Sequence, residues 1–332
     1  MQLTLDGDVV RAGSRARERF YDSRGYGHVR DGDLDLAPVE AAHLCYRGDI
    51  DAVDGMGVRE LLGSGVVSMV DFLVYKDLRD RGFYLTPARE GWVENPESVD
   101  FVVYPRGSGP WDDAVAHRVR SIGERDDLPA PSLGDCVLAI VDEESELTYL
   151  ETTDRAVGGT TAVGVPDVDG ELLAERVLCW DPPEALYERA FYGQRLDEDA
   201  VQLSLLEAAY LARDGTLTVE GGADAVIDRG RAVEGDRFDR RLTVYTALRD
   251  AGVVPKTGFK FGADFRTYAD VASVEELGHS ELLVRVLPAS HAFEPRDLAL
   301  DVRLAHGVRK TMVVALVDGE SITWTGVQRL TP

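Results

Sequence analysis

Hydrophobic and polar positions follow two spacings in the last part of the chain. From Pro295, the segment PRDLALDVRLAH places Leu298, Val302 and Ala305 three or four residues apart, which predicts a helix with proline in its first turn. The run KTMVVALV, from Lys310, predicts a strand at the centre of a sheet. SITWTGV is expected to pair with it after an acidic turn, and LLVRVLP alternates like a half-buried strand.

The middle of the chain predicts helices and a hairpin. An amphipathic helix is expected over Leu203–Arg213, ending in a turn at Asp214 and Gly215. A longer helix should follow from about Asp236 to Asp250, with Gly252 placed to close it. The segment FKFGADFRTY favours paired strands around a glycine turn.

The chain also contains an internal repeat. LAPVEAAHLCYRGDI near the start aligns with LSLLEAAYLARDGTL, and VYKDLRDRG, DFVVY and AIVDEES align in the same order with VYTALRDAG, DFRTY and ALVDGES. We infer a duplication, with repeats at 1–157 and 158–332. The predicted fold is α/β (α+β), each repeat being a small helical lobe followed by a mixed α/β lobe. The lobe boundaries are expected at about 1–62, 63–157, 158–233 and 234–332.

The acidic net charge of the chain does not by itself exclude a nucleic-acid partner. The 332 residues include 60 acidic and 36 basic side chains, giving a net charge of -24. Such a balance ordinarily counts against nucleic acid. However, the acidic, lysine-poor composition resembles that of proteins from salt-loving archaea, and at molar salt the Debye length is about 3 Å, so that local cations decide binding.

The location follows from what the chain lacks. Its first residues contain no apolar run of signal-peptide length, and no window is long enough to span a membrane. The three cysteines have no metal-ligand spacing and are expected to be buried free thiols in a reducing compartment. We expect a cytoplasmic protein with no membrane partner.

The second repeat holds three chemically active side chains that the first cannot assemble. They are Tyr268, opposite Tyr104; His279, opposite Asp112; and Lys310, opposite Gly134. Singly, each has an ordinary interpretation as a packed tyrosine, a loop histidine or a solvated lysine. Together they suit metal-free RNA cleavage, in which the 2′-hydroxyl attacks the adjacent phosphorus. That reaction needs a proton acceptor, a proton donor and a cation beside the phosphoryl oxygens.

The order of three motifs makes a family resemblance specific. GFKFGADFRTY, GHSELLVRV and RLAHGVRKTMVVALVDGESITW resemble the catalytic unit of archaeal tRNA-splicing endonucleases. The resemblance covers nearly the whole second repeat, and the first repeat resembles the non-catalytic copy of the tandem-repeat, homodimeric members. It implies that Tyr268 is the general base, His279 the general acid and Lys310 the transition-state cation, without metal or cofactor. The implied substrate is the bulge-helix-bulge of precursor tRNA, and the implied products end in a 2′,3′-cyclic phosphate and a 5′-hydroxyl.

Further residues are expected to bind RNA. By the same resemblance, Arg303 and Trp324 occupy the positions that sandwich a flipped base, since stacking is a common way to hold unpaired bases. An exposed helix cation and a packed core tryptophan are the alternatives. Lys256 and Lys260 add positive charge around the predicted hairpin of the second repeat, where Asp264 is the one acid.

The first repeat is expected to be kept for assembly. In the resembled family an acidic loop inserts into the opposing unit. The turn VDEESE is the richer of the two acidic turns, and its predicted docking residues are Asp142, Glu143, Glu144 and Glu146.

Three other interpretations stay open on the sequence. Asp264 and Asp318 could hold Mg²⁺ in another nuclease class, although both have equivalents in the first repeat, Asp100 and Asp142. The chain could instead be a non-catalytic RNA-binding or scaffold subunit, which the complete set of Tyr268, His279 and Lys310 argues against. A purely acidic interaction module fits the local cations poorly.

Overall fold

The computed structural model describes residues 3–332 and divides the chain into two compact units. The first unit takes the chain through Thr153, together with Ala292–Leu300 and Arg329–Pro332. The second takes Asp154–His291 and Asp301–Gln328. The predicted lobe boundaries, including the one between 157 and 158, remain predictions. Within residues 3–332, no helix combines the length and apolar character needed to cross a bilayer.

The first unit opens with a small sheet covered by helices. Its four antiparallel strands lie in the order β1, β2, β4, β3, so the lobe predicted as helical also contains a sheet. Ser68 caps the longest helix, its hydroxyl accepting from the Asp71 amide at 3.3 Å. The elements are β1 (Thr4–Asp6), β2 (Val9–Ala12), α1 (Ser14–Ala16), π-helix η1 (Arg17–Tyr21), α2 (Asp22–Arg24), β3 (His28–Arg30), β4 (Asp33–Leu36), α3 (Pro38–Tyr46), α4 (Val58–Gly63) and α5 (Met69–Asp80).

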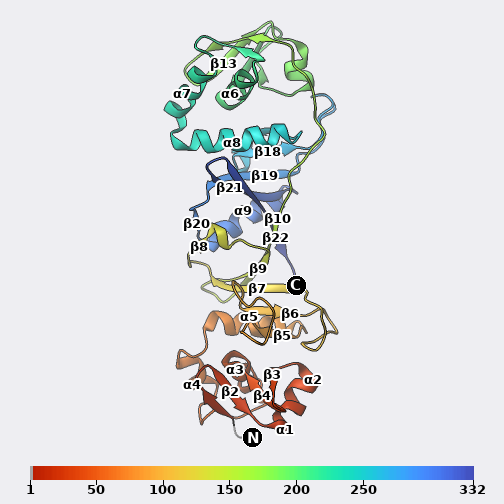
Figure 1. Ribbon diagram of the computed structural model, residues 1–332, viewed down its shortest axis with the longest axis vertical. Coiled ribbons are helices and arrows are strands. Elements are labelled where there is room, and N and C mark those ends of the chain that lie inside the picture. The colour runs from red at the N-terminus through yellow and green to blue at the C-terminus, as the bar shows by residue number, and fades with distance from the viewer. Residues whose placement is uncertain (1–2) are drawn as a thin grey trace. The chain divides into compact units, whose positions relative to one another are not determined.

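A mixed sheet completes the first unit. Its strands lie in the order β5, β6, β7, β9, β10, and only β7 and β9 run parallel. Helix α5 packs against β7 and β9 (Figure 1). The elements are β5 (Leu85–Pro87), β6 (Phe101–Val103), β7 (His117–Gly123), β8 (Leu128–Pro129), 3₁₀ helix η2 (Ala130–Ser132), β9 (Cys136–Val141) and β10 (Leu147–Asp154); β8 pairs with β20 (Ala292–Phe293).

The second unit begins with the same small lobe. Its sheet order is β12, β13, β15, β14, the counterpart of the first. Helix α6 has a reciprocal cap between Ser204 and Glu207 and ends at Gly215 in the left-handed conformation (φ 85°). The elements are β11 (Val168–Asp169), β12 (Glu171–Leu172), β13 (Arg176–Trp180), π-helix η3 (Ala185–Arg189), β14 (Gln194–Arg195), β15 (Ala200–Ser204), α6 (Leu205–Asp214), β16 (Leu217–Thr218), α7 (Gly222–Glu234) and α8 (Asp236–Asp250).

The second mixed sheet repeats the arrangement of the first. Its order is β17, β18, β19, β21, β22, with β19 and β21 parallel, and α8 packs against β17, β19 and β21 (Figure 1). The expected helix, central strand and partner strand are confirmed, and Leu298, Val302 and Ala305 are buried. The elements are β17 (Val254–Thr257), 3₁₀ helix η4 (Phe259–Phe261), β18 (Phe265–Tyr268), β19 (Leu282–Pro288), α9 (Pro295–Gly307), β21 (Thr311–Asp318) and β22 (Ser321–Leu330).

The predicted hairpin is correct in place and wrong in detail. β18 pairs with Val254–Thr257, upstream of the expected strand, whereas Phe259–Phe261 form the 3₁₀ turn between them. Gly262 closes this turn with a φ of 71°, a conformation that glycine adopts without steric cost.

Each small lobe contains a matching buried polar cluster. The carboxylate of Glu40 accepts from the amides of Gly27 (2.8 Å) and Ala37 (2.9 Å). That of Glu207 accepts from the amides of Gly193 (2.9 Å) and Ser204 (2.9 Å). Beside each lies an arginine stacked on tyrosine: Arg79 on Tyr26 at 3.7 Å, and Arg249 on Tyr192 at 3.8 Å. These equivalent contacts show that the repeat found in the sequence is also a repeat of the structure.

Candidate active site

The strand register of the second sheet brings three segments to one end. Thr267, at the end of β18, pairs with Leu282 on β19, and Leu282 pairs with Thr311 at the start of β21. Glu281 ties the three together: its amide donates to the Thr267 carbonyl (3.1 Å), and its carbonyl accepts from the Thr311 amide (3.1 Å). The next residues outward are Tyr268 and Lys310, and His279 lies two residues before Glu281. The fold therefore places the backbones of all three predicted catalytic residues at the same end of the strands β18, β19 and β21.

Tyr268 ends β18 in a mostly apolar setting. It is 5% exposed, and its ring packs edge-to-face on Phe191 at 5.8 Å. The Arg266 guanidinium lies 5.7 Å from the same ring. Within residues 3–332, nothing hydrogen-bonds to the Tyr268 hydroxyl. In the first unit the equivalent hydroxyl, that of Tyr104, is paired with Thr86 at 2.9 Å. The second tyrosine thus keeps its hydroxyl free for an external partner.

His279 and Lys310 differ in how firmly they are held. His279 is exposed on the loop before β19, and no described side chain or backbone group bonds its ring. The Lys310 ammonium donates to the Ser280 carbonyl (2.5 Å) and lies 5.8 Å from the Phe261 ring. Burial, followed by the nearby charge of Arg266, lowers the pKa of Lys310 below its ordinary value. The arrangement supplies a phenol, an imidazole and an ammonium with solvent access at the histidine.

Lys256 has an internal role instead. Its ammonium pairs with Glu207 at 2.9 Å and donates to the carbonyls of Gly193 (2.8 Å) and Phe191 (3.3 Å). Its side chain is only 11% exposed. A buried lysine with three partners has little to offer a phosphate, so Lys256 forms no part of the RNA surface proposed below.

The other predicted RNA contacts have different surroundings. Lys260 is exposed on the 3₁₀ turn, and Arg303 is exposed on α9. Trp324 is half-buried on β22, opposite Ala315, and packs against the core of the second unit. Lys260 and Arg303 are therefore accessible, whereas only part of the Trp324 ring is.

The acidic turn of the first repeat is partly structural. The Asp142 carboxylate accepts from the amides of Glu144 (2.9 Å) and Glu146 (2.8 Å), which shapes the turn. Glu143 pairs with Arg125 at 2.6 Å. Glu143, Glu144 and Glu146 are exposed, whereas the Asp142 carboxylate is occupied within the turn.

Asp264 is a structural residue and not a free metal ligand. Its carboxylate accepts from the Val286 amide (2.8 Å) and pairs with Arg237 (2.5 Å) and Arg241 (3.0 Å). Asp100 accepts from the Ser121 amide (2.7 Å) in the same way. The duplicated contact shows that both aspartates hold neighbouring strands together.

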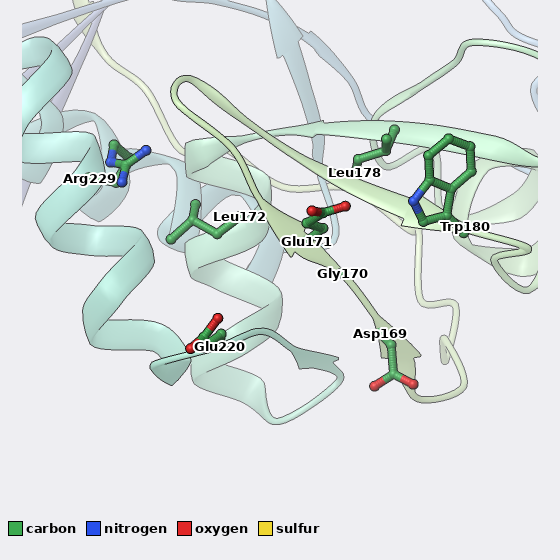
Figure 2. A pocket seen from close by; sticks show the side chains of 8 residues that line it. All are labelled: Asp169, Gly170, Glu171, Leu172, Leu178, Trp180, Glu220 and Arg229. Carbon is green, nitrogen blue, oxygen red and sulfur yellow. The ribbon is translucent and has the colours of Figure 1, made fainter.

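Two of the cavities in the second unit bear on the choice of an RNA site. One, of about 480 Å³, is lined by Phe191, which packs on the Tyr268 ring, and by Arg266, whose guanidinium lies 5.7 Å from the centre of that ring. The larger, of about 600 Å³, lies in the small lobe between β13 and α7 (Figure 2). Asp169, Glu171 and Glu220 line it, and its Arg229 donates to the Leu173 carbonyl. Three carboxylates against one arginine disfavour a phosphate ligand in the larger cavity. The smaller cavity also contains three carboxylates, but four cations offset them, so it is the better RNA candidate; its charged lining is Glu175, Glu207, Glu234, Arg176, Arg241, Lys256 and Arg266.

The charge pattern of the sequence does not single out Arg266. Arg266 is not among the residues predicted to bind RNA, yet strand alternation places it two residues before Tyr268 and on the same face of β18. That periodicity was the available signal.

Comparisons with known proteins agree with this geometry. The model of the catalytic C-terminal domain of tRNA intron endonuclease matches residues 238–324, and that of its N-terminal domain matches both 1–62 and 168–229. The chain is 74% identical to the tRNA-splicing endonuclease of Haloarcula marismortui and 59% identical to that of Haloferax volcanii, over the full length of each. It is 37% identical to that of Methanosarcina acetivorans over 99% of both chains.

Proposed function

The chain belongs to the tRNA intron endonuclease family and cleaves introns from tRNA, and from this we propose that one active site in the second repeat cuts precursor tRNA at bulge-helix-bulge junctions. The residues of that site are Tyr268, His279 and Lys310. The observation that carries the proposal is the register of β18, β19 and β21, which gathers these residues at one sheet edge.

Each residue has a defined part in the proposed reaction. Tyr268, as phenolate, accepts the proton of the 2′-hydroxyl while the 2′-oxygen attacks phosphorus. His279, as imidazolium, protonates the 5′-oxygen as its bond to phosphorus breaks. The Lys310 ammonium neutralises charge on the non-bridging oxygens. The products are a 2′,3′-cyclic phosphate and a 5′-hydroxyl, and the reaction uses no metal or cofactor.

The first unit lacks the same chemistry. Its Tyr104 hydroxyl is bonded to Thr86, and Gly134 stands where Lys310 stands in the second. The predicted counterpart of His279, Asp112, is wrong: counted back from the equivalent strand pairs Phe101–Val119 and Phe265–Val284, Ala114 is opposite His279. This asymmetry supports a single active site in each chain.

A bulge-helix-bulge RNA tests the reaction in the presence of EDTA. The wild-type chain should cut both junctions and leave cyclic phosphate and 5′-hydroxyl ends. An RNA with 2′-deoxyribose at each scissile nucleotide should bind and remain uncut, because its nucleophile is missing. Cleavage of the deoxy RNA, or 5′-phosphate ends, would refute the mechanism. Binding of the normal RNA without any cutting would favour the scaffold subunit.

We also propose a homodimer in the cytoplasm, joined through the exposed glutamates of the acidic turn. Two chains supply two sites for the two cuts that release an intron. The double substitution of Glu144 and Glu146 by Gln should raise the monomer fraction in sedimentation, most clearly at low salt, because surface attraction is screened by salt. Asp142→Asn is unsuitable as a test since it would disturb the turn. An unchanged sedimentation mass would contradict docking by this turn.

A further inference from the structure

Two neighbouring cations in the second unit have no acidic partner. Lys310 donates only to the Ser280 carbonyl, and Arg266 has no carboxylate within ion-pair distance among residues 3–332. In a chain with 60 acidic residues against 36 basic ones, an unpaired pair of cations requires an explanation. Two like charges held together without a counter-charge favour the binding of an anion.

The position of Arg266 is fixed by its strand. It sits on β18 opposite Lys256 and on the same face as Tyr268, whose ring is 5.7 Å from the guanidinium. Its Nε is buried and has no hydrogen-bond partner in the described chain. Arg266 also lines the cavity of about 480 Å³, so that the side chain borders space open to a ligand. Arg266 pairs with Leu283 on β19, and Leu283 pairs with Met312 on β21, two residues after Lys310, so that the two cations lie at the same end of these strands.

Arg266 has no counterpart in the first unit. The strand pairs Thr86–Val102 and Lys256–Arg266 are equivalent, so Val102 stands in its place. Lys310 is likewise replaced, by Gly134. Both cations are therefore confined to the repeat that holds the candidate active site, whereas the structural Asp100 and Asp264 occur in both repeats.

We propose that Arg266 binds a phosphate oxygen of the RNA at the cleavage site, beside Lys310. The ligand class is a phosphodiester, and this inference rests on the proposed function. A guanidinium can donate two parallel hydrogen bonds to phosphate, which an ammonium cannot. Arg266 orients the phosphate and shares its growing negative charge, and it transfers no proton.

The test compares Arg266→Gln, Arg266→Lys and a matched control, Arg213→Gln. Arg213 is an exposed arginine of the same unit, on α6, and its loss removes the same charge. Binding to the uncut 2′-deoxy RNA is measured across a salt series, and kcat is measured on the normal RNA. Arg266→Gln should lower kcat by about 10²-fold, the size seen when one oxyanion donor is removed. It should also reduce the slope of log Kd against log salt by about 1, as for one lost phosphate contact.

Arg266→Lys should keep the salt slope and recover part of kcat, because the charge remains while the two-pronged contact is lost. It also carries the test if Arg266→Gln does not fold. The control should match wild type. A wild-type kcat in Arg266→Gln would overturn the inference, as would a reduced kcat with an unchanged salt slope, since the arginine would then act through packing. Failure of the wild-type chain to cut would refute the proposed function instead, which separates the two.

Discussion

The two buried glutamates show how one duplicated cluster came to have opposite electrostatics. Glu207 pairs with Lys256 at 2.9 Å, and although burial opposes it, this cation holds the pKa of Glu207 down at about 2. Glu40 keeps the equivalent backbone donors, but Thr86 stands where Lys256 would be. Burial raises the pKa of Glu40 to about 7. The backbone scaffold of each lobe was conserved while the charge within it changed.

The same substitution changes the neighbouring tyrosine. In the first unit Thr86 bonds the Tyr104 hydroxyl, whereas in the second Lys256 turns to Glu207 and leaves Tyr268 unbonded. This position therefore decides whether the tyrosine hydroxyl has a hydrogen-bond partner in the described chain, although both rings are buried (Tyr104 6% and Tyr268 5% exposed).

The largest effect is expected at the proton donor. His279→Ala should lower kcat by about 10²–10⁴-fold, the usual contribution of a general acid. Asp112→Ala, in the corresponding loop of the first repeat, should leave kcat unchanged. Binding of the 2′-deoxy RNA should be similar in both variants. Equal cleavage rates for the two substitutions would remove the proposed difference between the repeats.

The next effect is on the stability of the second unit. Lys256→Met leaves the Glu207 carboxylate buried without its cation, which should cost about 3–5 kcal/mol of unfolding free energy. Lys260→Met, in the same hairpin but exposed, serves as the control and should change little. Trp180 and Trp324 lie in the second unit, and Trp92 and Trp111 lie in the first. Variants that retain only one of these pairs therefore report the urea unfolding of one unit by tryptophan fluorescence. A loss of stability reported only by Trp92 and Trp111, in the first unit, would contradict the role of Lys256.

A smaller effect should separate the units by pH. Glu40 has a folded pKa of about 7 against an ordinary 4.5, so the folded first unit keeps a proton that the unfolded chain has released. The contribution of Glu40 to the stability of this unit should therefore fall as pH rises from about 4.5 to 7, by roughly 3 kcal/mol at 1.36 kcal/mol per pKa unit. His43, whose pKa burial lowers to about 4, contributes with the opposite sign in this range. Glu207, with a folded pKa of about 2, has the opposite sign, and its contribution is lost as pH falls from 4.5 towards 2.

Glu40→Gln tests this assignment. The substitution should remove the Glu40 contribution to the pH dependence of first-unit stability between pH 4.5 and 7, as followed by the fluorescence of Trp92 and Trp111 during urea unfolding. The contributions of Asp71, with a pKa raised to about 6, and of His43, with a pKa lowered to about 4, should remain. Glu18→Gln, at an exposed position in the same unit, should preserve the Glu40 contribution. The same pH dependence in wild type and in Glu40→Gln would contradict this role of Glu40.

The sequence predicted those features that depend on neighbours along the chain. The helix over Asp236–Asp250, the apolar strand after Lys310 and the buried stripe of α9 all follow from local periodicity. The predicted catalytic residues could be named from motif order, and their gathering at one sheet edge needed the strand register.

Other roles depend on partners distant in sequence. Lys256 stands among surface-like residues, and its partner Glu207 is 49 positions away, so its burial could not be foreseen. Asp142 has the composition of a docking residue, and only backbone geometry shows that it shapes its own turn.

The most direct test of the account is the structure of the chain bound to a bulge-helix-bulge RNA with 2′-deoxyribose at the scissile nucleotides. It should place the Tyr268 hydroxyl, a His279 ring nitrogen and the Lys310 ammonium around one phosphate, each within about 3.5 Å of the 2′ position, the 5′-oxygen or a non-bridging oxygen. A scissile phosphate bound elsewhere, or contacted by only one of the three, would contradict a single active site at this edge of the second sheet.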